Sequence, residues 1–574
     1  MFRFIKKIKS KRYQLQDIDP DEIFLDSANL MNFDTDQFEG RIDKPIAKRT
    51  LGILYISFLL IFGGLLYKVF LLQVVQGEDN YKLSENNRLR ETLIFATRGT
   101  VYDRNGVPLI WNEPQTEGQD FAKRMYHQGE GLSGMLGYIT YPKKDSKGFY
   151  YELNYSGKEG VEKKFEDVIG GVNGSRIIET NALGEIISEN LVRNPNPGDP
   201  LILSIDSRVQ EQLYKSIKEI AQQVNFKGGG GIIMDIKTGE ILAMASYPEY
   251  DSQKIADGDA EYIKQASVNP ANPFLNRVTQ GLYTPGSIVK PIVALAALTE
   301  GVVTPETTVV SRGKLEVPNP YNPDNPTFFS DWKAHGNVDV RKAIAVSSNI
   351  FFYIVGGGYK DIRGEGVVPR TIGGLGITKI EKYMREFGFG SPVSGQVSSQ
   401  YSGTIPNPEW KAKNFDGDIW RLGDTYFTSI GQYGFQVTPL QVARAISAIA
   451  NKGTVLNPLL IKESQVDIDH VIEGITPQAY KVIHEGMRMG ATEGTGAGLN
   501  MEAVHIATKT GTAELGVSKD NINSWTTGFF PYENPRYAFV VVMEKGSRKN
   551  LIGGVAVSRK LFDWMAIYTP EYLK

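Results

Sequence analysis

The chain has 574 residues, of which 41% are hydrophobic, and it carries a formal net charge of −2 and no cysteine. That length predicts roughly two to four domains, and the apolar content excludes a largely disordered protein. The near-neutral charge gives no sign of nucleic-acid binding, and the lack of cysteine excludes disulfides, thiolate catalysis and cysteine-based zinc sites.

A membrane-spanning helix is predicted over residues 51–75. Leu51 to Tyr67 carry no charge and apolar residues resume at Val69, so the segment can cross a hydrocarbon core about 30 Å thick, which needs roughly 20 residues. A cleaved signal peptide is the alternative, but no small-residue cleavage site lies nearby. Because basic residues such as Lys48 and Arg49 precede the span, the positive-inside rule predicts a cytoplasmic tail over 1–50 and all later residues outside the cytoplasmic membrane.

Two local signals organise the next part of the chain. Asn105-Gly106 stands between apolar runs and predicts a tight hairpin. The segment from Arg193 to Asp199 is rich in proline, asparagine and glycine, which indicates a domain boundary. We therefore expect one domain over 76–198 and a second over 199–574.

The second domain is expected to have α+β structure. Leu201 to Ile205 predicts a strand, and apolar residues at helical spacing predict a helix from Val209 to Val224. Gly228 to Gly231 is expected to enter a strand, because the Lys-Ser/Thr of a phosphate-binding loop does not follow it. Further elements are expected as a hairpin across Lys237-Thr238-Gly239, strands over 526–530 and 537–543, and a closing helix over 557–568. Their order predicts an antiparallel sheet flanked by helices on both sides.

Ser287 and Lys290 form the most informative pair in the sequence. They lie three residues apart at what reads as the start of a helix, with Pro291 in its first turn. Residues at this spacing share a helix face, so the Lys290 amine can reach the Ser287 hydroxyl and, when neutral, take its proton. Burial and nearby cations would lower the pKa of Lys290 toward the working range. The alternative is an ordinary capped helix with Ser287 near its N-cap.

Two later motifs give this pair its significance. Ser347-Ser348-Asn349 precedes an aromatic stretch and could by itself be a helix cap. Lys509-Thr510-Gly511-Thr512 follows an apolar run and is expected on an edge strand, where Gly511 allows close approach of a peptide backbone. The Lys509 ammonium and the Thr510 hydroxyl suit a substrate carboxylate. The tripeptide alone is nonspecific, because Lys237-Thr238-Gly239 repeats it in a predicted turn.

The three motifs together resemble those of penicillin-binding proteins and serine β-lactamases. The chain is similar to class B enzymes of the elongation type, penicillin-binding protein 2. The stretches that carry this closer resemblance are Arg98-Gly99, 103–106, 157–162 and 170–184 in the expected pedestal, and 423–426, 429–432 and 438–441 in the second domain.

The resemblance implies a non-catalytic pedestal, a β-lactamase-like transpeptidase domain and a D,D-transpeptidase that cross-links peptidoglycan stem peptides during elongation and shape maintenance. Ser287 would attack the D-Ala-D-Ala amide, and Ser347 would relay a proton between Lys290 and the leaving group. Asn349 would bind the substrate peptide and hold Lys290, while the backbone N–H groups of Ser287 and Thr512 would form the oxyanion hole. No cofactor is implied; the implied partners are D-Ala-D-Ala stem peptides, β-lactams, the membrane, a SEDS-type glycan polymerase and other elongation proteins.

Two departures from the family pattern stand out. The segment between Asn112 and Gly157 is short for the pedestal head of this group. Some relatives bind zinc near the positions of Asp331 and His335, using a cysteine that this chain lacks. No metal is therefore predicted, and His335 is expected to be an ordinary polar residue of a loop.

Other activities remain as alternatives. A β-lactamase of class A would need a glutamate that activates water, and no E-x-x-L-N pattern occurs between Asn349 and Lys509. A D,D-carboxypeptidase shares the first half of the transpeptidase reaction. A catalytically silent scaffold for a glycan polymerase is the alternative outside the enzymes, and the three intact motifs count against it.

Overall fold

The computed structural model describes residues 47–574 except 116–118, 147–148, 181–185, 320–321, 323, 361–365, 369–370, 398–400 and 517, with only the backbone described for 83–88. Most of the predicted tail, residues 1–46, lies outside this part of the chain. The described residues form two compact units, one that runs to Leu89 and includes Thr180, and a much larger one that holds the remainder.

The smaller unit contains the predicted apolar helix. Helix α1 (Lys48–Phe70) continues into the π-helical turn η4 (Leu71–Val75), and helix α2 (Gly77–Arg88) follows. Within the 28 residues Lys48–Val75 the most apolar window of 18 residues has a mean hydropathy of 2.2 and is not buried, so by length and composition the segment can cross a membrane. The helix begins three residues before the predicted span.

The first part of the larger unit is rich in short strands. One sheet has the order β1 (Leu89–Ile94), β9 (Gly174–Thr180), β10 (Ile186–Arg193), and another has the order β11 (Leu201–Ile202), β2 (Val101–Tyr102), β3 (Pro108–Asn112), β4 (Arg124–Tyr126). Strand pairs and short helices complete it: β5 (Ile139–Thr140) with β8 (Ser156–Gly157), β6 (Lys143–Lys144) with β7 (Tyr150–Glu152), α3 (Ser133–Leu136), α4 (Gly160–Lys164) and α5 (Glu166–Ile169).

Sequence signals in this region are confirmed in part. The hairpin at Asn105-Gly106 joins antiparallel β2 and β3, and Gly106 has the positive φ of 84° that such a turn requires. The strand predicted over 201–205 is only two residues long. It is short because β2 ends at Tyr102: the Leu203 N–H still donates to the Tyr102 carbonyl, but the next N–H, of Ser204, donates to the carbonyl of Leu460.

A buried ion cluster joins two of the pedestal motifs. The Glu162 carboxylate accepts from Arg98 Nη2 at 2.6 Å and from Arg124 Nε at 2.7 Å, and all three side chains are at most 1% exposed. Arg98 also reaches Glu166 at 2.6 Å. Sequence stretches more than 60 residues apart are therefore held together by charge.

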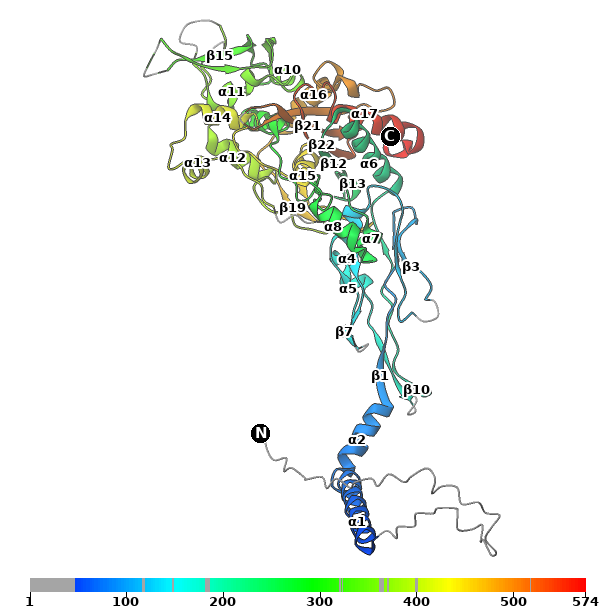
Figure 1. Cartoon of the computed structure of the whole chain (residues 1–574). Helices are drawn as coiled ribbons and strands as arrows, with labels where there is room; N and C mark the ends of the chain where they lie inside the picture. The colour runs from blue at the N-terminus through cyan, green and yellow to red at the C-terminus, as the bar shows by residue number, and fades with distance from the viewer. Residues whose placement is uncertain are drawn as a thin grey trace, which may run out of the picture. The chain divides into compact units, whose positions relative to one another are not determined.

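The second part of the larger unit contains the predicted antiparallel sheet. Its order is β13 (Ile241–Tyr247), β12 (Gly228–Asp235), β22 (Tyr537–Ser547), β21 (Asn521–Phe530), β20 (Ala507–Leu515), which leaves β20 at an edge. Alternate residues of β22 enter different cores: Phe539 and Val541 pack with α6 (Ser207–Val224) and α17 (Gly554–Tyr568), whereas Val540 and Val542 face the opposite core. Figure 1 shows α6 and α17 beside each other near the strands.

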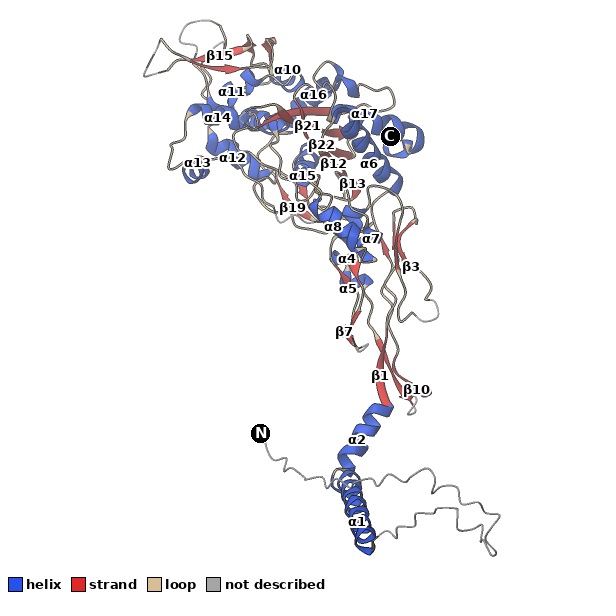
Figure 2. Ribbon diagram, in the orientation of Figure 1, coloured by secondary structure: helices blue, strands red, loops and turns tan. Residues whose placement is uncertain are grey.

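The opposite core is built mainly from helices α9 (Lys290–Thr299), α11 (Asn349–Gly357), α15 (Pro439–Ala450) and α16 (Pro477–Thr492). The sheet is thus flanked by helices on both sides, as predicted, and Figure 2 shows helices and strands intermixed in this part.

The remaining elements are α7 (Ser252–Ala256), α8 (Ala260–Val268), η5 (Gly286–Val289), β14 (Val309–Ser311), β15 (Lys314–Val317), β16 (Thr327–Ser330), β17 (Gly336–Val338), α10 (Val340–Ala345), α12 (Ile377–Glu386), α13 (Pro408–Asn414), α14 (Leu422–Ser429), β18 (Thr454–Leu456), β19 (Ile468–Val471), η6 (Ala497–Leu499) and η7 (Pro570–Tyr572).

The glycine run Gly228–Gly231 lies inside β12, which confirms that it enters a strand. A Cβ atom at Gly228 would lie 2.5 Å from Arg277 Nε, and one at Gly231 would lie 2.8 Å from Leu213 Cδ1. The glycines therefore let helix α6 and a buried arginine pack directly against the strand.

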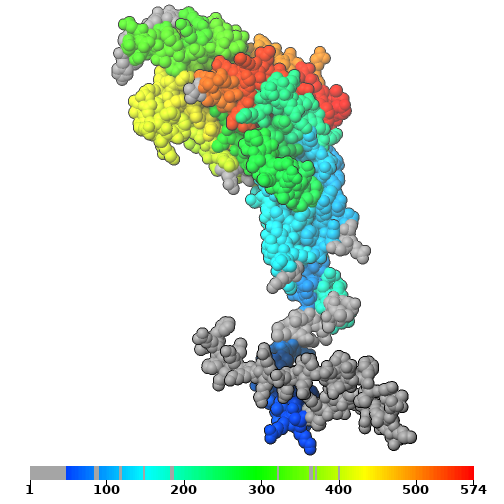
Figure 3. Space-filling model, viewed as in Figure 1, coloured from blue at the N-terminus to red at the C-terminus, as the bar shows by residue number. Residues whose placement is uncertain are grey.

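The pedestal residues contact the second part of the unit directly. Glu249, just after β13, accepts from the backbone N–H groups of Gly131 and Ser133, at 2.5 and 2.9 Å. Asn276, in the segment that leads to Ser287, donates to the Gly134 carbonyl at 3.0 Å. In Figure 3 the cyan pedestal surface is continuous with the green surface of the following residues.

Candidate active site

Ser287 lies on the 3-10 turn η5, which leads directly into helix α9. In a 3-10 turn the side chains at i and i+3 are eclipsed, which directs Ser287 and Lys290 to one side. Pro291 stands in the first turn of α9, as predicted. Neither helix has a side-chain cap hydrogen bond, so the alternative in which Ser287 serves as an ordinary N-cap is wrong.

Glycine backbone holds this turn in place. Gly286 has a φ of 56°, and its N–H donates to the carbonyl of Gly431 at 2.9 Å. A Cβ atom at Gly431 would lie 2.2 Å from the Gly286 carbonyl oxygen, so the two glycines permit the close contact. The stretch 429–432, which carried part of the family resemblance, therefore supports the Ser287 turn.

Lys290 is fully buried at the start of an apolar helix. Its Nζ atom donates to Asn349 Oδ1 at 2.7 Å, to the Ser347 carbonyl at 2.8 Å and to Ser347 Oγ at 3.4 Å. Burial lowers the pKa of Lys290 to about 7, although the Asp331 carboxylate acts in the opposite direction. Ser287 itself is half-buried, and among the described residues no hydrogen bond joins its hydroxyl to Lys290.

The Ser347-Ser348-Asn349 turn connects α10 to α11. Ser348 is the N-cap of α11, where its Oγ accepts from the Phe351 N–H at 3.4 Å. Ser347 has a φ of 57°, a left-handed conformation that is uncommon for a residue other than glycine. This conformation turns both the carbonyl and the hydroxyl of Ser347 toward Lys290.

Lys509 approaches the same hydroxyl from the edge strand β20. Its Nζ atom donates to Ser347 Oγ at 2.8 Å and to the Thr510 carbonyl at 2.7 Å. Burial, with a contribution from Lys290, lowers the pKa of Lys509 well below its usual range. Here the Lys509 ammonium is bound to Ser347 and Thr510, and the Thr510 hydroxyl lies 2.5 Å from the Thr495 hydroxyl.

Gly511 fits the Ser287 turn against β20. A Cβ atom at Gly511 would lie 2.9 Å from Ile288 Cγ2 and 3.0 Å from the Pro285 carbonyl oxygen. The sequence suggested close approach of a peptide ligand, whereas the neighbour in this structure is the turn of the chain itself. A Cβ atom at Gly286 would lie 3.2 Å from the Thr512 carbonyl oxygen, so Thr512 is next to the Ser287 turn.

The predicted residues therefore come together from three segments. The contacts join Lys290, Ser347, Asn349 and Lys509 directly, and they bring Gly511 and Thr512 against the turn that holds Ser287. Sequence reasoning missed Trp525 of β21, whose Nε1 donates to the Thr284 carbonyl at 3.0 Å. A single tryptophan in a buried strand gives no sequence signal that it will hydrogen-bond the segment just before Ser287.

Asp331 and His335 lie next to this cluster. Their side chains are 0% and 1% exposed, with 3.6 Å between His335 Nε2 and Asp331 Oδ1, so His335 is a buried residue of the loop between β16 and β17. A zinc site needs three or four nitrogen, sulfur or carboxylate ligands. The described residues contain no group of three or more His, Cys, Asp or Glu side chains able to hold a metal, so within them Asp331 and His335 lack the further ligands that zinc needs.

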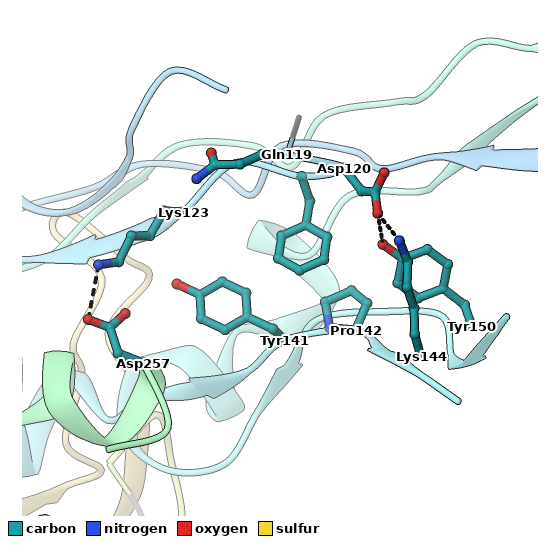
Figure 4. A pocket seen from close by; sticks show the side chains of 9 residues that line it. Gln119, Asp120, Lys123, Tyr141, Pro142, Lys144, Tyr150 and Asp257 are labelled. Carbon is teal, nitrogen blue, oxygen red and sulfur yellow. Dashed lines mark hydrogen bonds and ion pairs between the residues drawn. The ribbon is translucent and has the colours of Figure 1, made fainter. Parts of the chain in front are cut away.

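A groove of about 450 Å³ lies elsewhere, in the pedestal. Figure 4 shows its aromatic and proline side chains between two polar ends, one with Lys123 and Asp257 paired at 3.0 Å and one where Asp120 accepts from the Tyr150 hydroxyl at 2.6 Å. None of the predicted site residues lines this groove, so it is separate from the candidate active site.

Comparison with known protein families gives two matches. Residues 229–563 match the model of the penicillin binding protein transpeptidase domain. Residues 117–203 match the model of the penicillin-binding protein dimerisation domain. The two matches cover most of the second part and most of the pedestal of the larger unit.

Similar individual proteins agree with these matches. The peptidoglycan D,D-transpeptidase MrdA of Haemophilus influenzae is 28% identical, over 90% of this chain and 91% of its own. A complex of penicillin-binding protein 2 (PBP2) and MreC from Helicobacter pylori contains a chain that is 25% identical, with a TM-score of 0.66 over 83% of this chain and 99% of that one. A structure described as a peptidoglycan synthase complex that coordinates polymerization and crosslinking contains a chain that is 25% identical, with a TM-score of 0.68 over 90% of this chain and 98% of that one.

Proposed function

Because the chain belongs to the penicillin-binding protein transpeptidase family, we propose that it is a membrane-anchored, elongation-type peptidoglycan D,D-transpeptidase whose nucleophile is Ser287. One observation carries the choice of nucleophile. Lys290, one turn from Ser287, is a fully buried lysine with its pKa lowered to about 7. At physiological pH a large fraction of the Lys290 amines is therefore neutral, and the neutral form is the one that can act as a general base.

The acylation step follows from the positions of these groups. Neutral Lys290 takes the proton of Ser287, and the Ser287 oxygen attacks the carbonyl carbon of the penultimate D-Ala. The carbon–nitrogen bond breaks, and D-Ala leaves with a proton relayed through Ser347, which both lysines contact. The backbone N–H groups of Ser287 and Thr512 stabilise the oxyanion, and one such donor contributes about 10²–10³ in rate.

The second half-step joins two peptides. An amine of a neighbouring stem peptide attacks the carbonyl carbon of the acyl-enzyme. The ester bond to Ser287 breaks, the amine gives up a proton that passes to the Ser287 oxygen, and the new amide bond is the cross-link. The free edge of β20 suits an extended donor peptide, because an edge strand offers unpaired backbone groups. Substrate binding would also redirect Lys509 and Thr510 from their present partners to the substrate carboxylate. β-Lactams would acylate Ser287 in the same way.

Topology and partners follow from the same family. The N-terminus lies in the cytoplasm and the catalytic domain outside the membrane, as the basic residues before the span favour. The proposed domains are a tail over 1–50, a span over 51–75, a pedestal over 76–198 and a transpeptidase domain over 199–574. The relatives described with MreC and in a synthase complex support a SEDS-type glycan polymerase and other elongation proteins as partners.

Labelling with a fluorescent penicillin tests the nucleophile. Mass spectrometry of the digested full-length protein should find the label on Ser287, and the variant Ser287→Ala should take up none. Ser267→Ala is a matched control, because that serine is on the exposed helix α8 and its hydroxyl bonds only to a backbone carbonyl. Folded wild-type protein that stays unlabelled at Ser287 would overturn the proposal.

A donor peptide ending in D-Ala-D-Ala, supplied with an acceptor amine, tests the reaction type. The transpeptidase is expected to give the cross-linked peptide together with free D-Ala. Free D-Ala with no cross-linked product would identify a carboxypeptidase instead.

A further inference from the structure

The Asp331 carboxylate lies directly behind the Ser347–Asn349 turn. Its Oδ2 atom accepts four hydrogen bonds: from Ser311 Oγ at 3.1 Å, Ser348 Oγ at 2.8 Å, the Asn349 N–H at 2.9 Å and the Ile350 N–H at 3.2 Å. Its side chain is completely buried. A single carboxylate oxygen thus binds two hydroxyls and two backbone groups of the turn and its surroundings.

These contacts stabilise the part of the turn that has unpartnered backbone N–H groups and a left-handed residue. The first N–H groups of a helix have no partner within the helix, and Asn349 and Ile350 are the first two residues of α11. A buried anion at this helix end satisfies them and is favoured by the helix dipole. The neighbouring Ser347 has a left-handed φ of 57°, a conformation that persists only where the surroundings enforce it.

We propose that Asp331 is a positioning residue for acylation, whose buried carboxylate holds the Ser347–Asn349 turn in its active geometry and presents a negative charge to Lys290. The inference rests on the proposed role of Lys290 as the base for Ser287. Asp331 does not touch Lys290; it acts through the two residues that Lys290 contacts, Ser347 and Asn349.

The effect of the Asp331 charge on the pKa of Lys290 depends on the other charged groups nearby. Lys509 and His335 are the neighbouring basic groups: each has a lowered pKa, caused first by burial, and Lys290 adds to that lowering in both. Asp331 is the group that raises the pKa of Lys290 against burial. Without this charge the pKa of Lys290 falls below about 7, so the neutral amine persists to lower pH.

The variant Asp331→Asn separates charge from shape. The asparagine oxygen can still accept at the Oδ2 position, whereas the charge is lost together with the Oδ1 acceptor of the Trp332 N–H, which lies outside the turn. In the full-length protein, labelling of Ser287 by fluorescent penicillin should continue, with the acidic limb of its pH–rate profile moved to lower pH.

Asp331→Ala also removes the hydrogen bonds, and acylation should fall by about 10²-fold. Asp339→Asn is the control: Asp339 caps the neighbouring helix α10, and that profile should match the wild type.

The outcomes distinguish this inference from the proposed function. A wild type without label on Ser287 would overturn the function itself. A labelled wild type with an Asp331→Asn variant of unchanged rate and unchanged acidic limb would overturn the role of Asp331 alone. If Asp331→Asn does not fold, Ser348→Ala keeps the charge and removes one donor: acylation should fall about tenfold with the limb unmoved, and a wild-type rate would count against the proposal.

Discussion

The pedestal and the active site bury charge in opposite ways. In the pedestal, the Glu162 carboxylate lies between two buried arginines, and although burial opposes it, the ion pairs raise the pKa of Arg98. In the active site, Lys290 and Lys509 are both buried and share the hydroxyl of Ser347. Among the described residues, no carboxylate is within ion-pair distance of either lysine. The first arrangement stabilises a fold, and the second prepares an amine for proton transfer.

A third lysine with little exposed surface has carboxylate partners instead. Lys411 is only 3% exposed, but its Nζ atom lies 2.7 Å from Asp424 Oδ2 and 3.0 Å from Asp418 Oδ2. Although burial opposes the charged form, the two carboxylates raise the pKa of Lys411. Lys290 is 0% exposed, and burial lowers its pKa to about 7 while its hydrogen-bond partners, Asn349 Oδ1 and the Ser347 carbonyl, bring no negative charge to offset that burial. In this chain the lysine without a carboxylate partner is the one whose pKa falls.

Replacing Lys290 gives the largest effect and tests this distinction. The variant Lys290→Met keeps most of the side-chain volume and should lower acylation by about 10²–10⁴-fold, because the general base is lost. Its free energy of unfolding should fall less than that of the same substitution at Lys411, since no carboxylate loses its cation and only the Asn349 Oδ1 and Ser347 acceptors lose a donor. Stopped-flow labelling with a fluorescent penicillin and urea unfolding measure the two effects.

The same substitution at Lys411 is the control. Lys411→Met leaves Asp424 and Asp418 without their cation, so stability should fall. Equal stability losses for the two methionine variants would contradict the comparison.

Removing Glu162 tests the pedestal side. Glu162→Gln leaves Arg98 and Arg124 buried without their shared carboxylate, which should lower the free energy of unfolding by about 3–5 kcal/mol. Protein that remains folded should label at the wild-type rate, because the cluster lies in the pedestal. Glu152→Gln, which breaks the exposed pair with Lys143, should cost at most about 1 kcal/mol. A loss of labelling with unchanged stability in Glu162→Gln would show that the cluster serves catalysis instead.

Gly511 tests how closely the two parts of the active site must fit. The variant Gly511→Ala places a Cβ atom 2.9 Å from Ile288 Cγ2, so the Ser287 turn or strand β20 must move. A displacement of about 1 Å can cost 10²-fold in rate, and a loss of that order is expected in acylation. Gly516→Ala is the control, because Gly516 lies five residues further along the chain and nothing lies within 4 Å of its added Cβ. Its φ of 70° means that this variant reports the cost of backbone strain without a steric clash. A wild-type labelling rate in Gly511→Ala would mean that the contact is not required.

The sequence predicted the motifs of the active site better than their contacts. The spacing of Ser287 and Lys290 implied a shared face, and the position of Lys509 on an edge strand followed from its apolar surroundings. The role of Asp331 could not be predicted, because its carboxylate comes from a loop 16 or more residues before the turn it holds, a distance without periodicity. The pairing of Arg98 with Glu162 could not be predicted for the same reason, because 64 residues separate them, although both lie in stretches that resemble the family pedestal.

The pH dependence of acylation is the smallest effect, and it tests the lowered pKa of Lys290 directly. The neutral amine is the form that accepts the Ser287 proton, and one pH unit below a pKa about a tenth of an amine is neutral. With a pKa of about 7, the wild-type labelling rate should therefore fall roughly tenfold from pH 8 to pH 6. Thermal melting at both pH values shows whether the fold is retained. A rate that is flat over this range in folded protein would mean that burial does not supply a neutral amine at Lys290, and Lys290 would then resemble Lys411, whose pKa is raised.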